Sequence, residues 1–232
     1  MKNDLLSKIF IVFSIFYLSI ILFGREDLAL FLKPFLVPIL ILLVYKSENF
    51  NTKNILICAL IFSWIGDVIL IFADKGEIYF IIGLLFFLIS HILYIILFSK
   101  QIAQNNCIKN PIFIFSCIVV LVYLISMLTL LFPKLGSLKI PVSVYAITIS
   151  VMLISVLKGF FSWRNPAKTI ILLGAICFVK SDSLLAINKF HSPLTNASFW
   201  IMITYLIAQF CIAIGILTLN KRKITSLIYS FI

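Results

Sequence analysis

The sequence contains few charged residues. Only 12% of its 232 residues are Asp, Glu, Lys or Arg, whereas about a quarter of the residues in a soluble domain are charged. Hydrophobic residues make up 63% of the chain, and the mean hydropathy is +1.21. The apolar residues come in runs of about 20, the length that spans a bilayer as a helix. This composition excludes a soluble enzyme and indicates an integral membrane protein with no soluble domain.

Several familiar motifs are missing as well. The sequence has no GxSxG, P-loop, GxGxxG or HExxH pattern, and none of its cysteines forms a CxxC pair. Four of the five cysteines fall inside apolar runs, so we expect buried, inert thiols; the five are Cys58, Cys107, Cys117, Cys177 and Cys211. The two histidines, His91 and His191, lie at different depths and cannot form a three-histidine zinc site. We therefore expect neither a metal nor a cofactor.

Eight apolar runs are long enough to cross a membrane. Their length favours helices over the shorter, alternating strands of a barrel. The first run follows two lysines but ends in "IILFGRED", without a small-residue cleavage site, so we interpret it as a retained helix. The sequence predicts an all-α membrane bundle in a single domain, residues 1–232, with helices near 9–23, 28–45, 54–73, 78–98, 112–132, 140–161, 168–189 and 198–219.

The basic residues in the connections are unevenly distributed between the two sides. One side carries twelve: Lys2, Lys8, Lys46, Lys53, Lys100, Lys109, Lys158, Arg164, Lys168, Lys221, Arg222 and Lys223. The other side carries four: Arg25, Lys75, Lys134 and Lys139. Short cytoplasmic loops are rich in lysine and arginine, so both termini are predicted to lie in the cytoplasm. We expect the membrane to be the inner membrane of a bacterium. The net charge of +11 is then explained by anionic lipids rather than nucleic acid.

Two aspartates interrupt apolar runs. Asp67 lies in "WIGDVILIF" and Asp182 in "FVKSDSLLAI". Counting from the cytoplasmic starts of their helices places each about 20 Å into the membrane, in its outer half. A carboxylate inside a membrane is costly and usually marks a functional site, although hydrogen bonding within the bundle is a structural alternative.

Other polar residues reach the same depth by the same count. Lys33, Tyr145 and Tyr205 share the layer of the aspartates, Lys189 lies nearer the outer surface, and His91 lies deeper, toward the cytoplasmic half. Pro34 and Pro38 are expected to kink the second helix and free carbonyl groups beside Lys33. Together these positions predict a polar cavity that opens outward.

Each of these residues also has a structural interpretation. Lys33 could extend to the interface, His91 could be a hydrogen-bonded bundle histidine or a proton relay, and Tyr205 with Gln209, one turn apart, could bond within the core or contact substrate. Lys180 points away from Asp182 and is expected to pair or to reach the interface. Weak similarity between "GDVILIF" and "SDSLLAI" suggests a 4+4 internal repeat, with chance as the competing explanation.

Six segments together resemble the YhhN-type lysoplasmalogenase family: "KPFLVP", "GDVIL", "FFLISHILY", "PVSVYAITISVM", "GAICFVKSDSLLAINKF" and "TYLIAQFCIAIG". The resemblance implies about eight spans and hydrolysis of the vinyl ether bond of a lysophospholipid, a lysoplasmalogen, to a fatty aldehyde and a glycerophospho-amine. It implies that Asp67 and Asp182 are the catalytic acids. It further implies a substrate-binding set of Lys33, His91, Tyr145, Lys189, Tyr205 and Gln209.

The implied chemistry suits two carboxyl groups. One protonates the carbon beta to the ether oxygen, and its ionised partner stabilises the resulting cation and accepts a proton from water. Which aspartate does which is left open. A proton-coupled transporter or flippase is the alternative function, because inward-facing acids and broken helices also occur there. A structural membrane protein without chemistry leaves the polar layer unexplained. The sequence does not give the oligomeric state.

Overall fold

The computed structural model describes residues 2–102 and 110–230, with side chains for 5–102 and 110–221. Cys107 and Lys109 lie outside the described residues, as do the side chains of Lys2, Arg222 and Lys223, which the charge count used. The helical elements are α1 (Lys2–Leu22), α2 (Glu26–Leu32), η1 (Lys33–Phe35), α3 (Leu36–Tyr45), α4 (Lys53–Leu70), α5 (Glu77–Gln101), α6 (Pro111–Leu131), η3 (Phe132–Lys134), η4 (Gly136–Leu138), α7 (Lys139–Phe160), α8 (Ala167–Ala186), η5 (Ile187–His191) and α9 (Ala197–Ser230).

Eight helical stretches in the described residues are long and apolar enough to cross a membrane, so the prediction of an all-α bundle with eight spans is confirmed. The second span comprises α2, η1 and α3 together. Large apolar side chains remain exposed on the outer faces of the bundle, for example on α6. Such faces are suited to lipid rather than to water.

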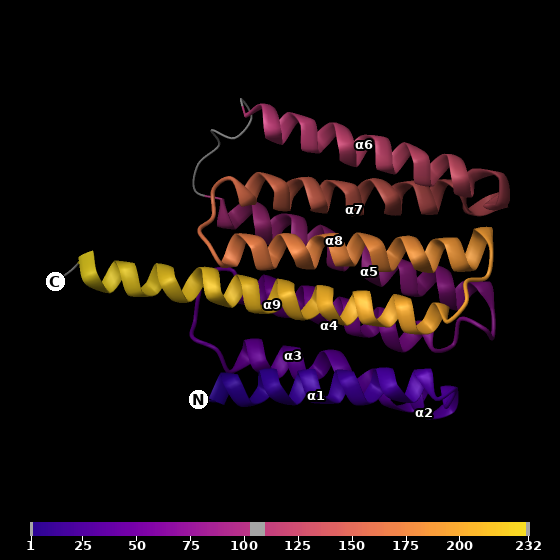
Figure 1. Cartoon of the computed structure of the whole chain (residues 1–232), viewed down its shortest axis with the longest axis horizontal. Helices are drawn as coiled ribbons and strands as arrows, with labels where there is room; N and C mark the ends of the chain where they lie inside the picture. The colour runs from indigo at the N-terminus through magenta and orange to yellow at the C-terminus, as the bar shows by residue number, and fades with distance from the viewer. Residues whose placement is uncertain (1, 103–109, 231–232) are drawn as a thin grey trace.

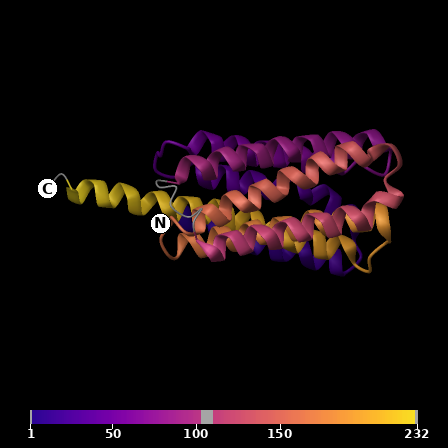
Figure 2. The same ribbon diagram turned by 90° about the horizontal axis from the view of Figure 1, so that it is seen from above.

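The helices run side by side along the long axis of the molecule (Figure 1). α1 begins and α9 ends at the same end of the bundle, which we call the terminal end, and α9 projects beyond the other helices there (Figures 1 and 2). The opposite end, which we call the distal end, holds the connections from α1 to α2, α4 to α5, α6 to α7, and α8 to α9. The basic-residue count predicts that the distal end faces outward.

The second span is broken where the prolines predicted a break. α2 ends at Leu32, and a short 3₁₀ segment carries Lys33 and Pro34 before α3 begins. Proline has no backbone N–H, so Pro38 cannot donate a helical hydrogen bond to the carbonyl oxygen of Pro34, four residues earlier, and leaves that oxygen available. The Trp64 side chain on α4 donates its indole N–H to the Pro34 carbonyl oxygen at 2.7 Å. This contact fixes the broken segment, and with it Lys33, against α4.

Glycines allow close packing within the two most extensive helix pairs, α4 with α5 and α8 with α9. A Cβ atom at Gly174 on α8 would lie only 3.0 Å from the Ala208 carbonyl oxygen on α9. A Cβ atom at Gly83 on α5 would lie 2.7 Å from Leu70 on α4. Small residues at such positions let helix backbones approach one another, a common device in membrane bundles.

The expectation of buried thiols is wrong for Cys58, which is exposed on the surface of α4. It is only partly right for Cys117, Cys177 and Cys211, which are half-buried. Occurrence within an apolar run shows that a residue lies at membrane depth. It does not show whether the residue faces the bundle or the lipid, because helix rotation decides that.

Replacing Gly174 with leucine should destabilise the bundle, because the new side chain would press on the α9 backbone. Overpacking of this kind costs about 1–3 kcal/mol, so we expect the melting temperature of the protein in detergent to fall by about 2–12 °C. Leu173→Ala is the control, since Leu173 is the exposed neighbour. Equal melting temperatures for Gly174→Leu and wild type would contradict the close approach of α8 and α9.

The orientation can be tested with a reporter enzyme that is active only outside the cytoplasm. Fused after Ile232, the reporter should be inactive, because the terminal end is predicted to be cytoplasmic. Inserted after Lys75, in the connection from α4 to α5, the same reporter should be active. Activity of the fusion after Ile232 would refute the predicted orientation.

Candidate active site

Asp67 is buried within the bundle, three residues before the end of α4, with only 3% of its surface exposed. The Tyr205 hydroxyl on α9 donates to its Oδ2 atom at 2.6 Å. Lys33, from the broken second span, places its ammonium group 3.8 Å from the Oδ1 atom. The carboxyl group of Asp67 therefore has a hydrogen-bond donor on one oxygen and a cation near the other.

The direction of the Tyr205 hydrogen bond is set by Gln209, one turn further along α9. The Gln209 side-chain amide donates to the Tyr205 oxygen at 3.1 Å, and its carbonyl oxygen accepts a hydrogen bond from the Tyr94 hydroxyl at 2.7 Å. A phenol has one proton to donate. With Gln209 occupying an acceptor position of the Tyr205 oxygen, that single proton is directed to Asp67.

Asp182 forms the second acidic cluster. The Tyr145 hydroxyl on α7 donates to its Oδ2 atom at 2.5 Å, and the His91 Nε2 atom on α5 lies 3.0 Å from the same oxygen. His91 Nε2 is also 3.1 Å from the Tyr145 hydroxyl, so the three side chains converge on one point. The other ring nitrogen of His91, Nδ1, is buried without a hydrogen-bond partner in the described part of the chain.

Phe178, one turn before Asp182 on α8, packs against both clusters. Its ring centroid lies 4.7 Å from that of His91 and 5.7 Å from that of Tyr205, each in an edge-on arrangement. Phe87 on α5 contacts the same Tyr205 ring at 5.9 Å. The two acidic clusters thus share an aromatic wall.

The contacts to the two aspartates are reciprocal between the halves of the chain. Asp67 is on the third span and is bonded by Tyr205 on the eighth, whereas Asp182 is on the seventh span and is contacted by His91 on the fourth. Each aspartate therefore lies on the third span of one half and is held by the last span of the other. A 4+4 repeat would produce this arrangement, although the repeat itself stays a prediction.

A pocket of about 280 Å³ opens at the distal end above both aspartates. Four charged side chains, Glu26, Lys33, Asp74 and Lys189, line it, together with Tyr17, Asn188 and Ser198. Two of these side chains are acidic and two are basic. We call this hollow the distal pocket.

The inner lining of the distal pocket is related to the acidic clusters by simple helix geometry. It includes Leu70 on α4, Leu185 on α8 and Met202 on α9. These residues are each three positions from a site residue, respectively Asp67, Asp182 and Tyr205. Residues three apart lie on the same face of a helix, about 4.5 Å apart along its axis. Apolar side chains one turn away therefore lie between the pocket and the acids, except where Lys33 lines the pocket and also reaches Asp67 at 3.8 Å.

The structure brings together most residues that the sequence singled out. Lys33 and Tyr205 contact Asp67, Gln209 contacts Tyr205, and Tyr145 contacts Asp182. Lys189 lines the distal pocket, and its ammonium group lies 5.3 Å from the centroid of the Phe80 ring. Lys180 is exposed on the surface of α8.

The predicted depth of His91 is wrong. It was placed toward the cytoplasmic half, but its imidazole contacts Asp182 directly. The count assumed that all helices start in one plane and run upright, whereas α5 is 25 residues long and a histidine side chain reaches across to its neighbours. The depths of His91 and Asp182 were counted from opposite ends of the membrane-spanning helices, so the errors of the two estimates add when the depths are compared.

The prediction of an open polar cavity also needs correction. Asp67 and Tyr205 are each 3% exposed, and His91 and Gln209 are fully buried. Asp182 and Tyr145 line a pocket of about 50 Å³ between α6, α7 and α8. The open space belongs to the distal pocket, whose apolar lining was not predicted because it depends on side-chain packing.

Two residues of the distal pocket were missed, namely Glu26 and Asp74. A signal was available, because the chain has only eight acidic residues and these two lie at helix ends on the predicted outer side. As for metal ions, no group of three or more His, Cys, Asp or Glu side chains within the described ranges is suited to hold one.

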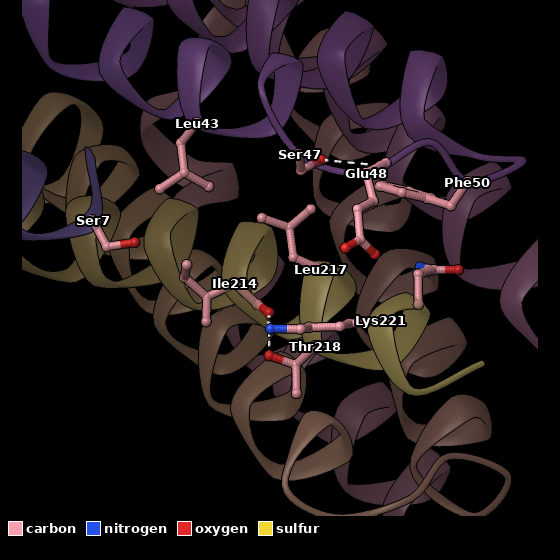
Figure 3. A pocket seen from close by; sticks show the side chains of 10 residues that line it. Ser7, Leu43, Ser47, Glu48, Phe50, Ile214, Leu217, Thr218 and Lys221 are labelled. Carbon is pink, nitrogen blue, oxygen red and sulfur yellow. Dashed lines mark hydrogen bonds between the residues drawn. The ribbon is translucent and has the colours of Figure 1, made fainter. Parts of the chain in front are cut away.

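A separate pocket of about 250 Å³ lies at the terminal end, where Glu48 and Lys221 are among its lining residues (Figure 3). Lys221 is 16 residues beyond Tyr205 on α9, which corresponds to about 24 Å along the helix. This pocket is therefore remote from the acidic clusters. The distal pocket and the layer beneath it are the candidate active site.

Comparison with known proteins agrees with the resemblance. Lysoplasmalogenase TMEM86A of Homo sapiens is 31% identical over 169 residues, and its Bos taurus counterpart is 30% identical over the same length. Each match covers 67% of this chain and 62% of the relative, so the chain spans less than two thirds of these relatives. No solved structure has significant similarity to the chain. Residues 28–216 match the YhhN family. The chain is thus a multi-pass integral membrane protein and belongs to the YhhN family.

Proposed function

We propose that the protein is a membrane-embedded lipid hydrolase that cleaves the vinyl ether bond of a lysoplasmalogen-like lysophospholipid. One observation carries the proposal most directly: the same pocket has inner-lining residues one helical turn from both Asp67 and Asp182. A buried acid, Asp67, and a partly buried acid, Asp182, beneath one pocket can act on one bound molecule. The two similar relatives named lysoplasmalogenase support the same reaction class.

The reaction needs an acid and a base in a dry setting. A carboxyl group transfers its proton to the vinyl carbon beta to the ether oxygen, which leaves an oxocarbenium ion at the alpha carbon. Water adds to that carbon and gives a proton to the other carboxylate. The hemiacetal then collapses to a fatty aldehyde and the glycerol hydroxyl of the released head. Asp67 and Asp182 divide these two tasks between them.

Tyrosines orient the two acids for this work. Tyr205 and Tyr145 each donate to the Oδ2 atom of an aspartate, at 2.6 Å and 2.5 Å. The Oδ1 atoms accept neither tyrosine proton and are proposed to act on the substrate, that of Asp67 with the Lys33 ammonium group 3.8 Å away. The shared wall of Phe178 and Phe87 limits water around a cationic intermediate. Such preorganised, partly dry surroundings strengthen electrostatic stabilisation.

The charges of the distal pocket fit a zwitterionic headgroup. Lys33 and Lys189 are suited to a phosphate, and Glu26 and Asp74 to an ammonium group. Charged partners of this kind give hydrogen bonds about twice as strong as neutral ones. The proposal therefore places the glycerophospho-amine head in the distal pocket and the vinyl ether beneath it.

The paired-acid mechanism predicts that Asp67→Asn and Asp182→Asn each lower turnover by about 100-fold or more, because asparagine cannot supply or accept the proton. The double variant should be scarcely worse, since groups that act as a unit are not additive. Purified protein in detergent is incubated with a lysoplasmalogen, and free aldehyde is measured by mass spectrometry. Detergent micelles have no compartments, so a transporter gives no signal in this assay.

Asp27→Asn is the matched control, because Asp27 is an exposed acid in the first turn of α2. It should retain wild-type turnover. Size-exclusion profiles show whether each variant is folded. Near-normal aldehyde release by a well-folded Asp67→Asn or Asp182→Asn protein would end the paired-acid mechanism, and no aldehyde from wild type with any vinyl ether lysolipid would end the proposed function.

The headgroup assignment predicts a binding defect for Lys189→Gln. Loss of a charge-assisted contact to phosphate should raise KM about tenfold and change kcat much less. Lys180→Gln is the control, since Lys180 lies nine residues earlier in the chain and is exposed outside the distal pocket. Equal kinetics for Lys189→Gln and wild type would remove Lys189 from the binding site.

A further inference from the structure

A second hollow, of about 320 Å³, lies between α5 and α7, and we call it the α5–α7 groove. Its lining is almost wholly apolar and includes Phe80, Leu84 and Leu88 from α5, and Val142, Val144 and Tyr145 from α7. No charged side chain lines it. Such a surface has nothing to offer a polar ligand, but it suits a hydrocarbon chain.

The groove is open to the side of the bundle. Val144 is 47% exposed and Leu85 is 51% exposed, and both lie within membrane-spanning helices. Their exposed faces therefore meet lipid rather than water. A chain in this groove could slide in from the bilayer without crossing a polar region.

Phe80 joins the groove to the distal pocket, because it lines both. The Lys189 ammonium group lies 5.3 Å from the centroid of the Phe80 ring, and the Phe190 ring packs edge-on against it at 5.5 Å. Phe80 is itself only 3% exposed. The polar distal pocket and the apolar α5–α7 groove thus meet at the Phe80 ring. A lipid has the same arrangement, with a polar head joined directly to an apolar chain.

The inner end of the groove reaches the acid layer. Tyr145 lines the groove, and its hydroxyl donates to Asp182 at 2.5 Å. From Phe80 to Leu88 the helix rises about 12 Å, which is most of the roughly 15 Å depth of one leaflet's hydrocarbon. The groove therefore runs from the distal end toward the middle of the membrane, alongside one of the two aspartates.

We propose that the α5–α7 groove holds the alkenyl chain of the lipid while its head occupies the distal pocket, so that the substrate enters sideways from the leaflet at the distal end. This inference rests on the proposed function for the identity of the lipid. The glycerol backbone then falls beside Phe80, the vinyl ether follows it inward toward Tyr145 and Asp182, and the chain continues in the groove that Leu84 and Val144 line. These two side chains set which chains are accepted.

The test fills the groove with a side chain that the bundle can tolerate. Val144→Trp places an indole in the groove at an exposed position, whereas Val151→Trp makes the same change two turns along α7, at a position 42% exposed and outside the groove. Displacing one methylene from an apolar site costs tenfold or more in specificity. Val144→Trp should therefore lower kcat/KM about tenfold for a lysoplasmalogen with a 16-carbon chain and leave a four-carbon analogue unaffected.

Val151→Trp should match wild type with both substrates. The chain site is refuted if Val144→Trp turns over both substrates like wild type, or loses both equally, because neither result depends on chain length. Equal loss in both variants refutes it as well, since the effect would then belong to the lipid-facing surface in general.

A binding experiment on the wild-type protein is independent of turnover. The probe is a lysolipid with a saturated alkyl ether, which cannot be hydrolysed by this route, and a photoreactive diazirine on the chain. Crosslinks are expected on peptides that contain 80–88 and 138–145. Crosslinks confined to other helices would overturn the chain site. That result is expected if a second copy of the protein or a structural lipid covers the groove instead. Crosslinks in the groove without aldehyde release from any vinyl ether would support the chain site and reject the proposed function.

Discussion

A carboxyl group within a bundle of apolar helices is stable only where other groups of the protein satisfy its oxygens. This protein meets that requirement twice. Asp67 accepts from Tyr205 and lies near Lys33, and Asp182 accepts from Tyr145 beside His91. These partners come from four different spans, so helix positions, the break at Pro34 and the rotation of α9 are all constrained by the same need.

The apolar layer of Leu70, Leu185 and Met202 reconciles two opposing requirements of the proposed chemistry. A cationic intermediate and a proton-carrying acid favour a site with little water, yet one water molecule must enter for hydrolysis. Of the four charged side chains of the distal pocket, Lys33 alone reaches an acid, since its ammonium group lies 3.8 Å from Asp67.

The sequence predicted the number of spans and the break beside Lys33 because hydropathy and proline act locally. It also predicted that Lys33, Asp67 and Tyr205 meet, since a shared depth in a small bundle leaves few alternatives. It failed for His91, whose position depends on tilt and side-chain reach, and for Cys58, whose exposure depends on helix rotation. The closed state of the site and the shared role of Phe80 arise from packing between distant helices, which no local pattern encodes.

The reciprocal contacts have a consequence for biosynthesis. Neither half of the chain contains a complete set of partners for its own aspartate. Asp67, in the first half, accepts a hydrogen bond from Tyr205 in the second half, and Asp182, in the second half, is contacted by His91 in the first half. As the ribosome delivers spans in order, Asp67 enters the membrane five helices before its phenolic partner. The nascent protein must shelter one unsatisfied acid until α9 arrives, so insertion of the final helix is the step that completes both the fold and the site.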